Sequence, residues 1–199
     1  MGQMLWQFTM ATIASPRDGI RAVFGLGLPA QALWLGLALS ILMSTIFFGI
    51  VTMIRPPDPA PEGTPVLALD IWQFALVQMF VSWLSVYALL FIGRMFDGQG
   101  DLQRCLAAVS WHAWISAFLL VVATVLSLAL PPIGPFLLML QVGFVLVAMV
   151  IFVAEAHGFQ NLFAVAGGII GSVFVLATIS AILLIILGLG PALEGLENV

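Results

Sequence analysis

The run AQALWLGLALSILMSTIFFGIVTMI, from Ala30 to Ile54, contains no charged residue. A bilayer core of about 30 Å is crossed by roughly 20 helical residues, so this run is long enough to span a membrane. Pro29 precedes it and the proline-rich segment 55–65 follows it, and both are typical of loops rather than of helix interiors. The run therefore predicts a transmembrane helix at 30–54.

Four further apolar runs follow in the same chain. Glycines and prolines separate them, as at 131–135 and 188–191. The composition agrees, since 63% of the 199 residues are hydrophobic and 7% are charged, against about 25% charged in a soluble domain. We therefore predict an all-α integral membrane protein with five transmembrane helices in a membrane domain at 30–190, followed by a tail at 191–199. The four additional spans are expected at 66–92, 106–130, 135–154 and 163–189.

The first 29 residues form a separate N-terminal segment. They lack the basic start of a secretory leader, so we expect them to be retained. Apolar residues recur at helical spacing, with Thr12 on the first apolar face and Ile20 and Val23 on a second. We expect these faces to dip into lipid while Arg17 and Arg21 reach anionic head groups. The segment is thus predicted to be short, amphipathic and interfacial.

The arginines orient the chain. With five spans, the N-terminal segment and the loops at 93–105 and 155–162 share one side and carry four of the five basic residues, whereas the other side carries only Arg55. Positive residues favour the cytoplasmic side of a membrane. We therefore expect a cytoplasmic N-terminus and an external C-terminus.

The string GQGD at 98–101 matches the G-x-G-D motif of intramembrane aspartyl proteases. Such a protease needs a second aspartate at the same membrane depth on a neighbouring helix. Asp97 lies in the same turn, and Asp70 is expected a bilayer away. We therefore predict that Asp101 caps the N-terminus of the third span, where an acceptor oxygen and a negative charge are both favourable.

Other reactive residues form no convincing centre. Cys105 is the only cysteine, and His112 lies about 10 Å along the same helix, too far for a thiolate–imidazole pair. Neither H-E-x-x-H nor G-x-S-x-G occurs, and a net charge of -4 offers no basic patch for nucleic acid. We expect no catalytic residue, cofactor, metal or nucleic-acid partner. Trp111 and Trp114 are interpreted as anchors at the membrane interface.

Polar side chains inside the spans need partners, because an unpaired polar group in hydrocarbon costs free energy. Gln73, Gln78 and Gln141 lie within predicted spans, and Glu155 lies at the end of the fourth. They would either line a solute path or form hydrogen bonds between helices. Since no charged residue lies near a midplane, we favour hydrogen bonds, with Glu155 paired to an arginine.

Small residues form faces on three spans, where helix backbones can approach closely. Such faces serve either packing within one bundle or homodimerisation, and we favour packing within the bundle. The candidate packing residues are Gly36, Ser40, Gln78, Ser82, Gln141, Gly167 and Gly171.

Three motifs resemble the bacterial branch of the Ypt-interacting-protein (YIP) family of five-helix membrane proteins. They are the string SPR at 15–17, the loop FDGQGDL at 96–102, which is similar to a family F-G-G-x-G-S-F turn, and AHGF at 156–159 before the last span. In eukaryotes the family is associated with Rab-type GTPases and vesicle traffic. The resemblance implies no catalysis, cofactor or substrate.

The resemblance leads us to expect a non-enzymatic membrane-organising or partner-binding component of the bacterial cytoplasmic (inner) membrane. A small-solute transporter subunit is the alternative, and an intramembrane aspartyl peptidase is a further one. The expected partners are membrane lipids and either another membrane protein or further copies of this chain. The candidate residues for interaction at the cytoplasmic face are Arg17, Arg21, Arg94, Asp97, Asp101, Arg104, Glu155 and His157.

Overall fold

The computed structural model describes residues 2–54 and 71–186, excluding the side chains at 175–177 and 179–186. This part of the chain is helical and contains no strand, which confirms the all-α prediction. The elements are α1 (Gly2–Ala14), α2 (Pro16–Gly25), α3 (Ala30–Ile54), α4 (Ile71–Met95), α5 (Leu102–Ala129), the 3-10 turn η1 (Pro131–Ile133), α6 (Gly134–His157) and α7 (Leu162–Ile186).

Within the described residues, four helices are long and apolar enough to cross a membrane: α3, α4, α5, and α6 together with η1. Helix α7 follows them. The continuous part of α7 whose side chains are described, Leu162–Phe174, is apolar but too short to cross a bilayer. The predicted fifth span at 163–189 extends beyond the described residues. The fold is therefore that of a multi-pass helical protein.

Helix boundaries follow local capping signals. Helix α3 has the predicted bounds, whereas α5 begins at Leu102, four residues before the predicted start at 106. Asp101 explains that earlier start, since its Oδ1 accepts the Arg104 N–H at 2.7 Å, and this confirms the predicted cap. Helix α6 runs on to His157 because Gly158, with φ of 76°, supplies the left-handed conformation that ends it.

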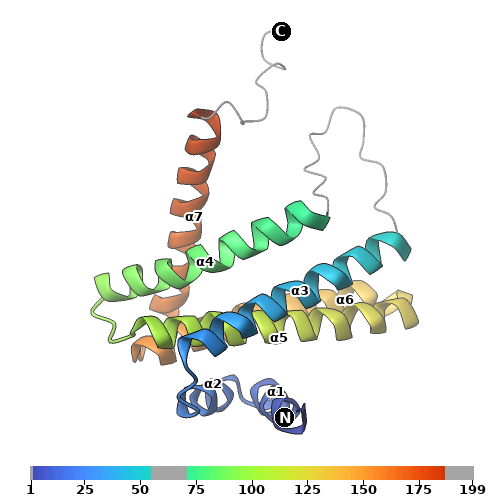
Figure 1. Ribbon diagram of the computed structural model, residues 1–199, viewed down its shortest axis with the longest axis horizontal. Helices are drawn as coiled ribbons and strands as arrows, with labels where there is room; N and C mark the ends of the chain where they lie inside the picture. The colour runs from blue at the N-terminus through green and yellow to red at the C-terminus, as the bar shows by residue number, and fades with distance from the viewer. Residues whose placement is uncertain (1, 55–70, 187–199) are drawn as a thin grey trace, which may run out of the picture.

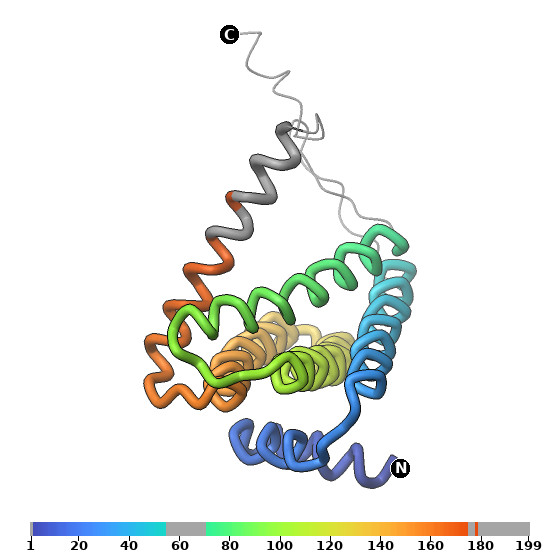
Figure 2. The backbone as a smooth tube through the Cα atoms, turned by 60° about the vertical axis from the view of Figure 1, so that its left-hand side comes forward, coloured from blue at the N-terminus to red at the C-terminus, as the bar shows by residue number. Residues whose placement is uncertain are grey.

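The helices are arranged around α5. Figure 1 shows α3, α5 and α6 running side by side, with α4 crossing above them and α7 leaving the group at a steep angle. Helices α1 and α2 lie beneath one end of this layer, which Figure 2 shows from the side. Helix α5 packs against α3, α4, α6 and α2 and so lies at the centre of the bundle.

The buried core reflects that central position. Positions 105–110 of α5 are all buried. Leu106 and Val109 join α3 and Val86 of α4 in one cluster, and Ala108 joins α2 and α6 in another. The small Ala108 allows α6 to approach, with Phe152 packed in the second cluster. A helix that is apolar all round is suited to this enclosed place.

Packing between α3 and its neighbours uses the predicted small and polar residues. A side chain added at Gly36 would lie 3.2 Å from the Ser110 hydroxyl, which itself donates to the Leu33 carbonyl at 3.0 Å. Ser44 donates to Gln78 Oε1 at 2.9 Å and so joins α3 to α4. The expected hydrogen bond between helices at Gln78 is confirmed.

Two other packing predictions are wrong for the described bundle. A Cβ added at Gly167 or Gly171 would meet nothing within 4 Å, because α7 contacts α6 through a different face that includes the buried Val165. Gln141 is half-buried on α6, and no hydrogen bond links its side chain to another described residue. The glycine face of α7 thus points away from the rest of the described bundle.

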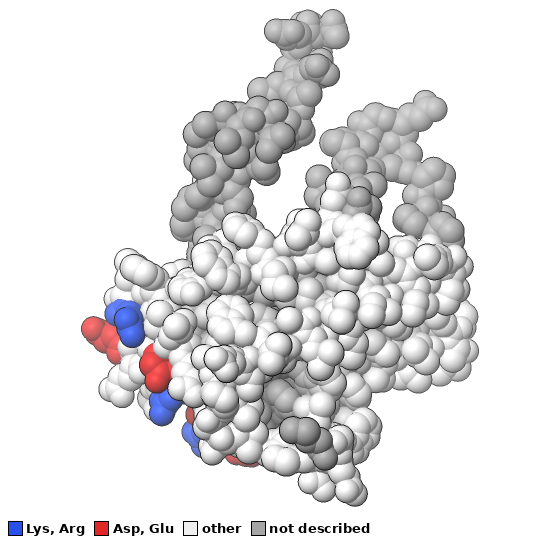
Figure 3. Space-filling model, viewed as in Figure 1, with Lys and Arg blue, Asp and Glu red and all other residues white. Residues whose placement is uncertain are grey.

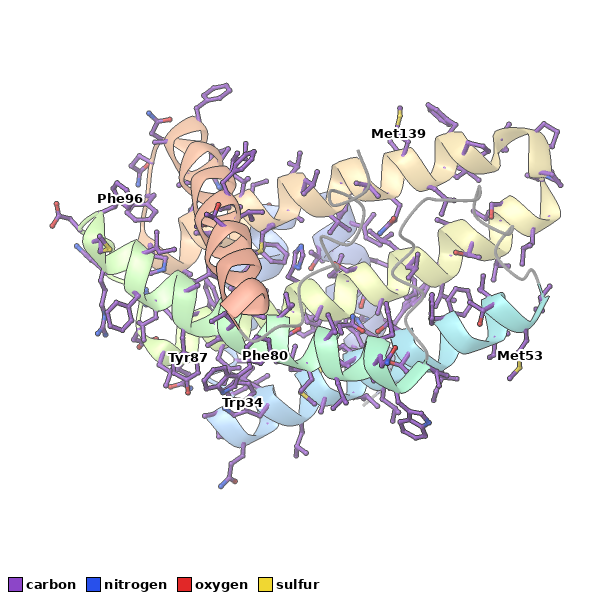
Figure 4. The ribbon with its side chains drawn as sticks, turned by 90° about the horizontal axis from the view of Figure 1, so that it is seen from above. Trp34, Met53, Phe80, Tyr87, Phe96 and Met139 are labelled. Atoms are coloured by element: carbon purple, nitrogen blue, oxygen red, sulfur yellow. The ribbon has the colours of Figure 1, made fainter. Side chains whose placement is uncertain are left out.

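The outer surface of the bundle is apolar. Met53 on α3, Met139 on α6 and Phe96 after α4 project outward in Figure 4, and they are 84%, 68% and 66% exposed. Isolated exposed apolar residues are ordinary, but a surface covered with them is suited to lipid. This surface accords with a membrane location for α3 to α6.

Candidate functional site

The charged residues that the structure describes gather at one end of the bundle. Figure 3 shows blue and red atoms at that end, while the rest of the visible described surface is white. Contacts between distant segments define it: Arg17 of α2 reaches Glu155 of α6, and the Gln99 N–H donates to the His157 carbonyl at 3.1 Å. The structure therefore brings the N-terminal segment, the α4–α5 turn and the end of α6 together at one end, which we call the polar end.

Glu155 is paired with two arginines of α2. Arg17 Nε lies 2.8 Å from Glu155 Oε1, and Arg21 donates from Nε to Oε2 at 2.7 Å and from a terminal nitrogen to Oε1 at 3.2 Å. The Glu155 side chain is 14% exposed, whereas the arginines are 45% and 60% exposed. The hydrogen bond and charge of Glu155 raise the pKa of Arg21. The predicted pairing of Glu155 with an arginine is confirmed.

The lipid-facing interpretation of α2 is wrong. Ile20 and Val23 are 0% and 5% exposed, and they pack against Ala108 of α5 and Phe152 of α6. An amphipathic helix can place its apolar face on protein as well as on lipid, since either removes that face from water. Arg17 and Arg21 therefore contact Glu155 rather than serving as free anchors for head groups.

Helix α1 is fastened to α5 by hydrogen bonds between tryptophans and threonines. Trp111 and Trp114 donate their indole N–H groups to the hydroxyls of Thr12 and Thr9, both at 3.0 Å. Thr12 and Thr9 are 0% and 1% exposed. The interpretation of these tryptophans as interface anchors is corrected, because their polar atoms bind another helix of the same chain.

His157 is the centre of the polar end. Its side chain is 2% exposed and enclosed by three glycines, since a Cβ added at Gly93, Gly98 or Gly100 would overlap the imidazole ring. The Gly100 N–H donates to its Nδ1 at 3.2 Å, and Phe159 stacks on the ring with centroids 5.4 Å apart. His157 thus fastens the α4–α5 turn to the end of α6, and a residue with a side chain would not fit at any of the three glycine positions without movement.

Cys105 lies beside the same imidazole. Its Sγ is 3.6 Å from His157 Nε2, and its side chain is 0% exposed. Because Nδ1 accepts the Gly100 N–H, the neutral ring carries its proton on Nε2, which faces the sulfur. In that tautomer the ring does not accept a proton from the thiol. The contact is therefore suited to packing and polar satisfaction rather than to activating a nucleophile.

Sequence reasoning compared Cys105 only with His112, rejected that pair, and did not consider His157. His112 approaches the Val145 carbonyl at 3.1 Å, on the α6 side of α5. The partner of Cys105 lies 52 positions along the chain, and no local spacing links the two. The sequence offered only an indirect signal for this contact. Glycines at 93, 98 and 100 and the histidine at 157 were predicted to lie on the same side of the membrane, but nothing in their spacing placed them together.

The aspartates of the polar end have separate structural roles. Asp101 caps α5, and Asp97 adopts a left-handed conformation with φ of 59° in the turn. Asp18 accepts the Ser15 hydroxyl at 2.6 Å, and Asp70 lies outside the described residues. Among the residues the structure describes, no group of three His, Cys, Asp or Glu side chains could hold a metal ion.

These features define a class: a multi-pass, all-α membrane protein with a polar end built from three distant segments. Comparison of the chain with protein-family models, curated proteins and solved structures gave no match. The resemblance to the YIP family therefore rests on the sequence motifs alone.

Proposed function

We propose that this chain is a non-enzymatic, YIP-like membrane protein that binds a partner through its α4–α5 turn. The partner is another membrane protein or a further copy of this chain. One observation carries the proposal: the turn is fixed from beneath by His157 while Arg94, Met95, Phe96 and Asp97 on it are exposed.

A fixed and exposed turn favours recognition. Met95 and Phe96 are 78% and 66% exposed, so the turn offers a large apolar contact area beside the charged Arg94 and Asp97. Phenylalanine, methionine and arginine are all enriched at protein–protein interfaces relative to the rest of the surface. Because His157 already orders the backbone, binding would lose little conformational entropy.

A photo-crosslinking residue at Phe96 tests the proposal in intact cells. We expect a discrete crosslinked product from position 96 and none from position 53, since Met53 is even more exposed than Phe96 but lies at the other end of the bundle. Asp97→Asn should weaken the product, because asparagine tolerates the left-handed conformation but lacks the charge. Identical patterns at both positions would refute partner binding at the turn, and solute uptake into vesicles would favour the transporter alternative.

The orientation is part of the proposal. We place the polar end in the cytoplasm of a bacterial cell, because the arginines are concentrated on that side. The chain then crosses the membrane a fifth time at 163–189, and its tail at 191–199 lies outside. An impermeant thiol reagent should label Ala60→Cys but not Gln99→Cys in intact cells. The native Cys105 is buried and gives a low background. Labelling at position 99 from outside would reverse the orientation.

A further inference from the structure

A hollow of about 220 Å³ opens at the polar end, between the α2–α3 connection and the first turn of α5. Its floor is apolar and includes Val23 of α2, Leu33 of α3 and Ala107 of α5. Asp101 and Arg104 border the same hollow and are both exposed. One side chain of each charge thus stands over an apolar floor, in a space several times the roughly 30 Å³ share of one water molecule.

The rim of the hollow is held in place by hydrogen bonds. Gln103 donates from Nε2 to the Leu28 carbonyl at 2.7 Å and so joins α5 to the α2–α3 connection. Asp101 is fixed by the Arg104 N–H, which occupies its Oδ1. Gly27, with φ of 58°, provides the bend between α2 and α3 that forms the opposite wall. The hollow therefore does not need a ligand to form.

Both charged groups of the rim are available to a ligand. Within residues 2–54 and 71–186, the ion pairs join Arg17 and Arg21 to Glu155, and neither Asp101 nor Arg104 takes part in one. A guanidinium binds phosphate through paired N–H groups, and a carboxylate accepts hydrogen bonds from a primary ammonium. The rim is thus complementary to a ligand that carries both a phosphate and an ammonium.

The position of the hollow matches the head-group level of a membrane. Helices α3 and α5, which are both apolar enough to cross a bilayer, begin beside it at Ala30 and Leu102. Leu26 and Leu28 next to it are 38% and 37% exposed. Counted over the described residues, the polar end carries four arginines and four carboxylates, so it has no net charge that would favour an anionic lipid over a zwitterionic one.

We propose that this hollow binds the phosphoethanolamine head group of a glycerophospholipid. Arg104 binds the phosphate, the free oxygen of Asp101 accepts a hydrogen bond from the ammonium, and the glycerol lies against the apolar floor. A phosphoglycerol head group offers Asp101 no cation, and a phosphocholine head group offers it no N–H donor. The site therefore selects phosphoethanolamine over both. This inference is independent of the partner-binding proposal.

Native mass spectrometry of the protein in neutral detergent tests the inference. The protein is mixed with phosphatidylethanolamine, phosphatidylcholine and phosphatidylglycerol of identical acyl chains, and retention of each lipid is compared. We expect phosphatidylethanolamine to be retained roughly tenfold more strongly, as the loss of one charge-assisted hydrogen bond would imply. Equal retention of the three lipids would overturn the proposal.

Three variants separate the contributions. Arg104→Gln should abolish the preferred binding, and Asp101→Asn should remove the discrimination between lipids while keeping the helix cap, since asparagine caps as well as aspartate. Arg94→Gln is the matched control, because Arg94 belongs to the same end but does not line the hollow. Melting temperatures without lipid establish that each variant folds.

Two results would refute the assignment. Unchanged retention in folded Arg104→Gln or Asp101→Asn would place the lipid elsewhere. Competition by free phosphoethanolamine at the concentration at which the lipid itself binds would show that the site takes a soluble ligand and not a lipid.

Discussion

Gly93→Ala tests whether His157 is fixed as tightly as its surroundings indicate. The new methyl group would overlap Cε1 and both ring nitrogens of His157. The ring has little room to move, because Gly100 donates to its Nδ1, Cys105 lies 3.6 Å from its Nε2, and its side chain is 2% exposed. The variant must therefore displace the imidazole or push α4 away from α6.

Two opposing effects set the size of the change. Overpacking a well-filled site costs about 1–3 kcal/mol. Alanine in place of glycine inside a helix stabilises it by about 1 kcal/mol. Gly93→Ala should thus destabilise the protein by roughly 0–2 kcal/mol, and a single variant would not separate the clash from the helix propensity.

A double-mutant cycle with His157→Ala separates them. Without the imidazole the clash disappears, and Gly93→Ala should then stabilise by about 1 kcal/mol. The two backgrounds should differ by about 1–3 kcal/mol, the cost of overpacking alone. Denaturant or thermal unfolding in detergent measures each variant. His157→Ala by itself should cost about 1–3 kcal/mol, since it leaves the buried Gly100 N–H without its acceptor.

Gly143→Ala in α6 is the matched control. An added Cβ there meets nothing within 4 Å, so its effect should be the same with and without His157. If Gly93→Ala also changed stability equally in the two backgrounds, the imidazole would not occupy the space between the three glycines, and the account of the polar end would be wrong.

Three further predictions follow from the same structure. Asp101→Asn should leave stability nearly unchanged, whereas Asp101→Ala should lower it by about 0.5–2 kcal/mol in thermal melts, because only the alanine removes the cap; equal losses in both would exclude capping. Glu155→Gln should speed tryptic cleavage after Arg21, since α2 loses its ion pairs with α6; unchanged cleavage would mean that the apolar face alone holds α2. Gly171→Leu should leave the melting temperature of the monomer unchanged, because the position faces open space, and a large loss would show that this face packs against something after all.

The sequence alone determined the features that depend on neighbours along the chain. The apolar run at 30–54 is α3 to the residue, because a long apolar stretch satisfies its backbone only as a helix in lipid. Asp101 caps α5 and Gly158 ends α6, since each acts on backbone groups within four residues of itself. Glu155 needed a cation for a similar reason: an unpaired charge at the end of a span is costly.

Only the tertiary structure decided where apolar and small faces point. Lipid and protein both remove an apolar face from water, so nothing in the pattern of Ile20 and Val23 distinguished a helix on the membrane from one docked on α5 and α6. The same ambiguity misled the interpretation of Gly171, whose face is open in this chain. The enclosure of His157 joins residues from three separate segments, and its physical basis, steric fit around one ring, has no counterpart in local sequence.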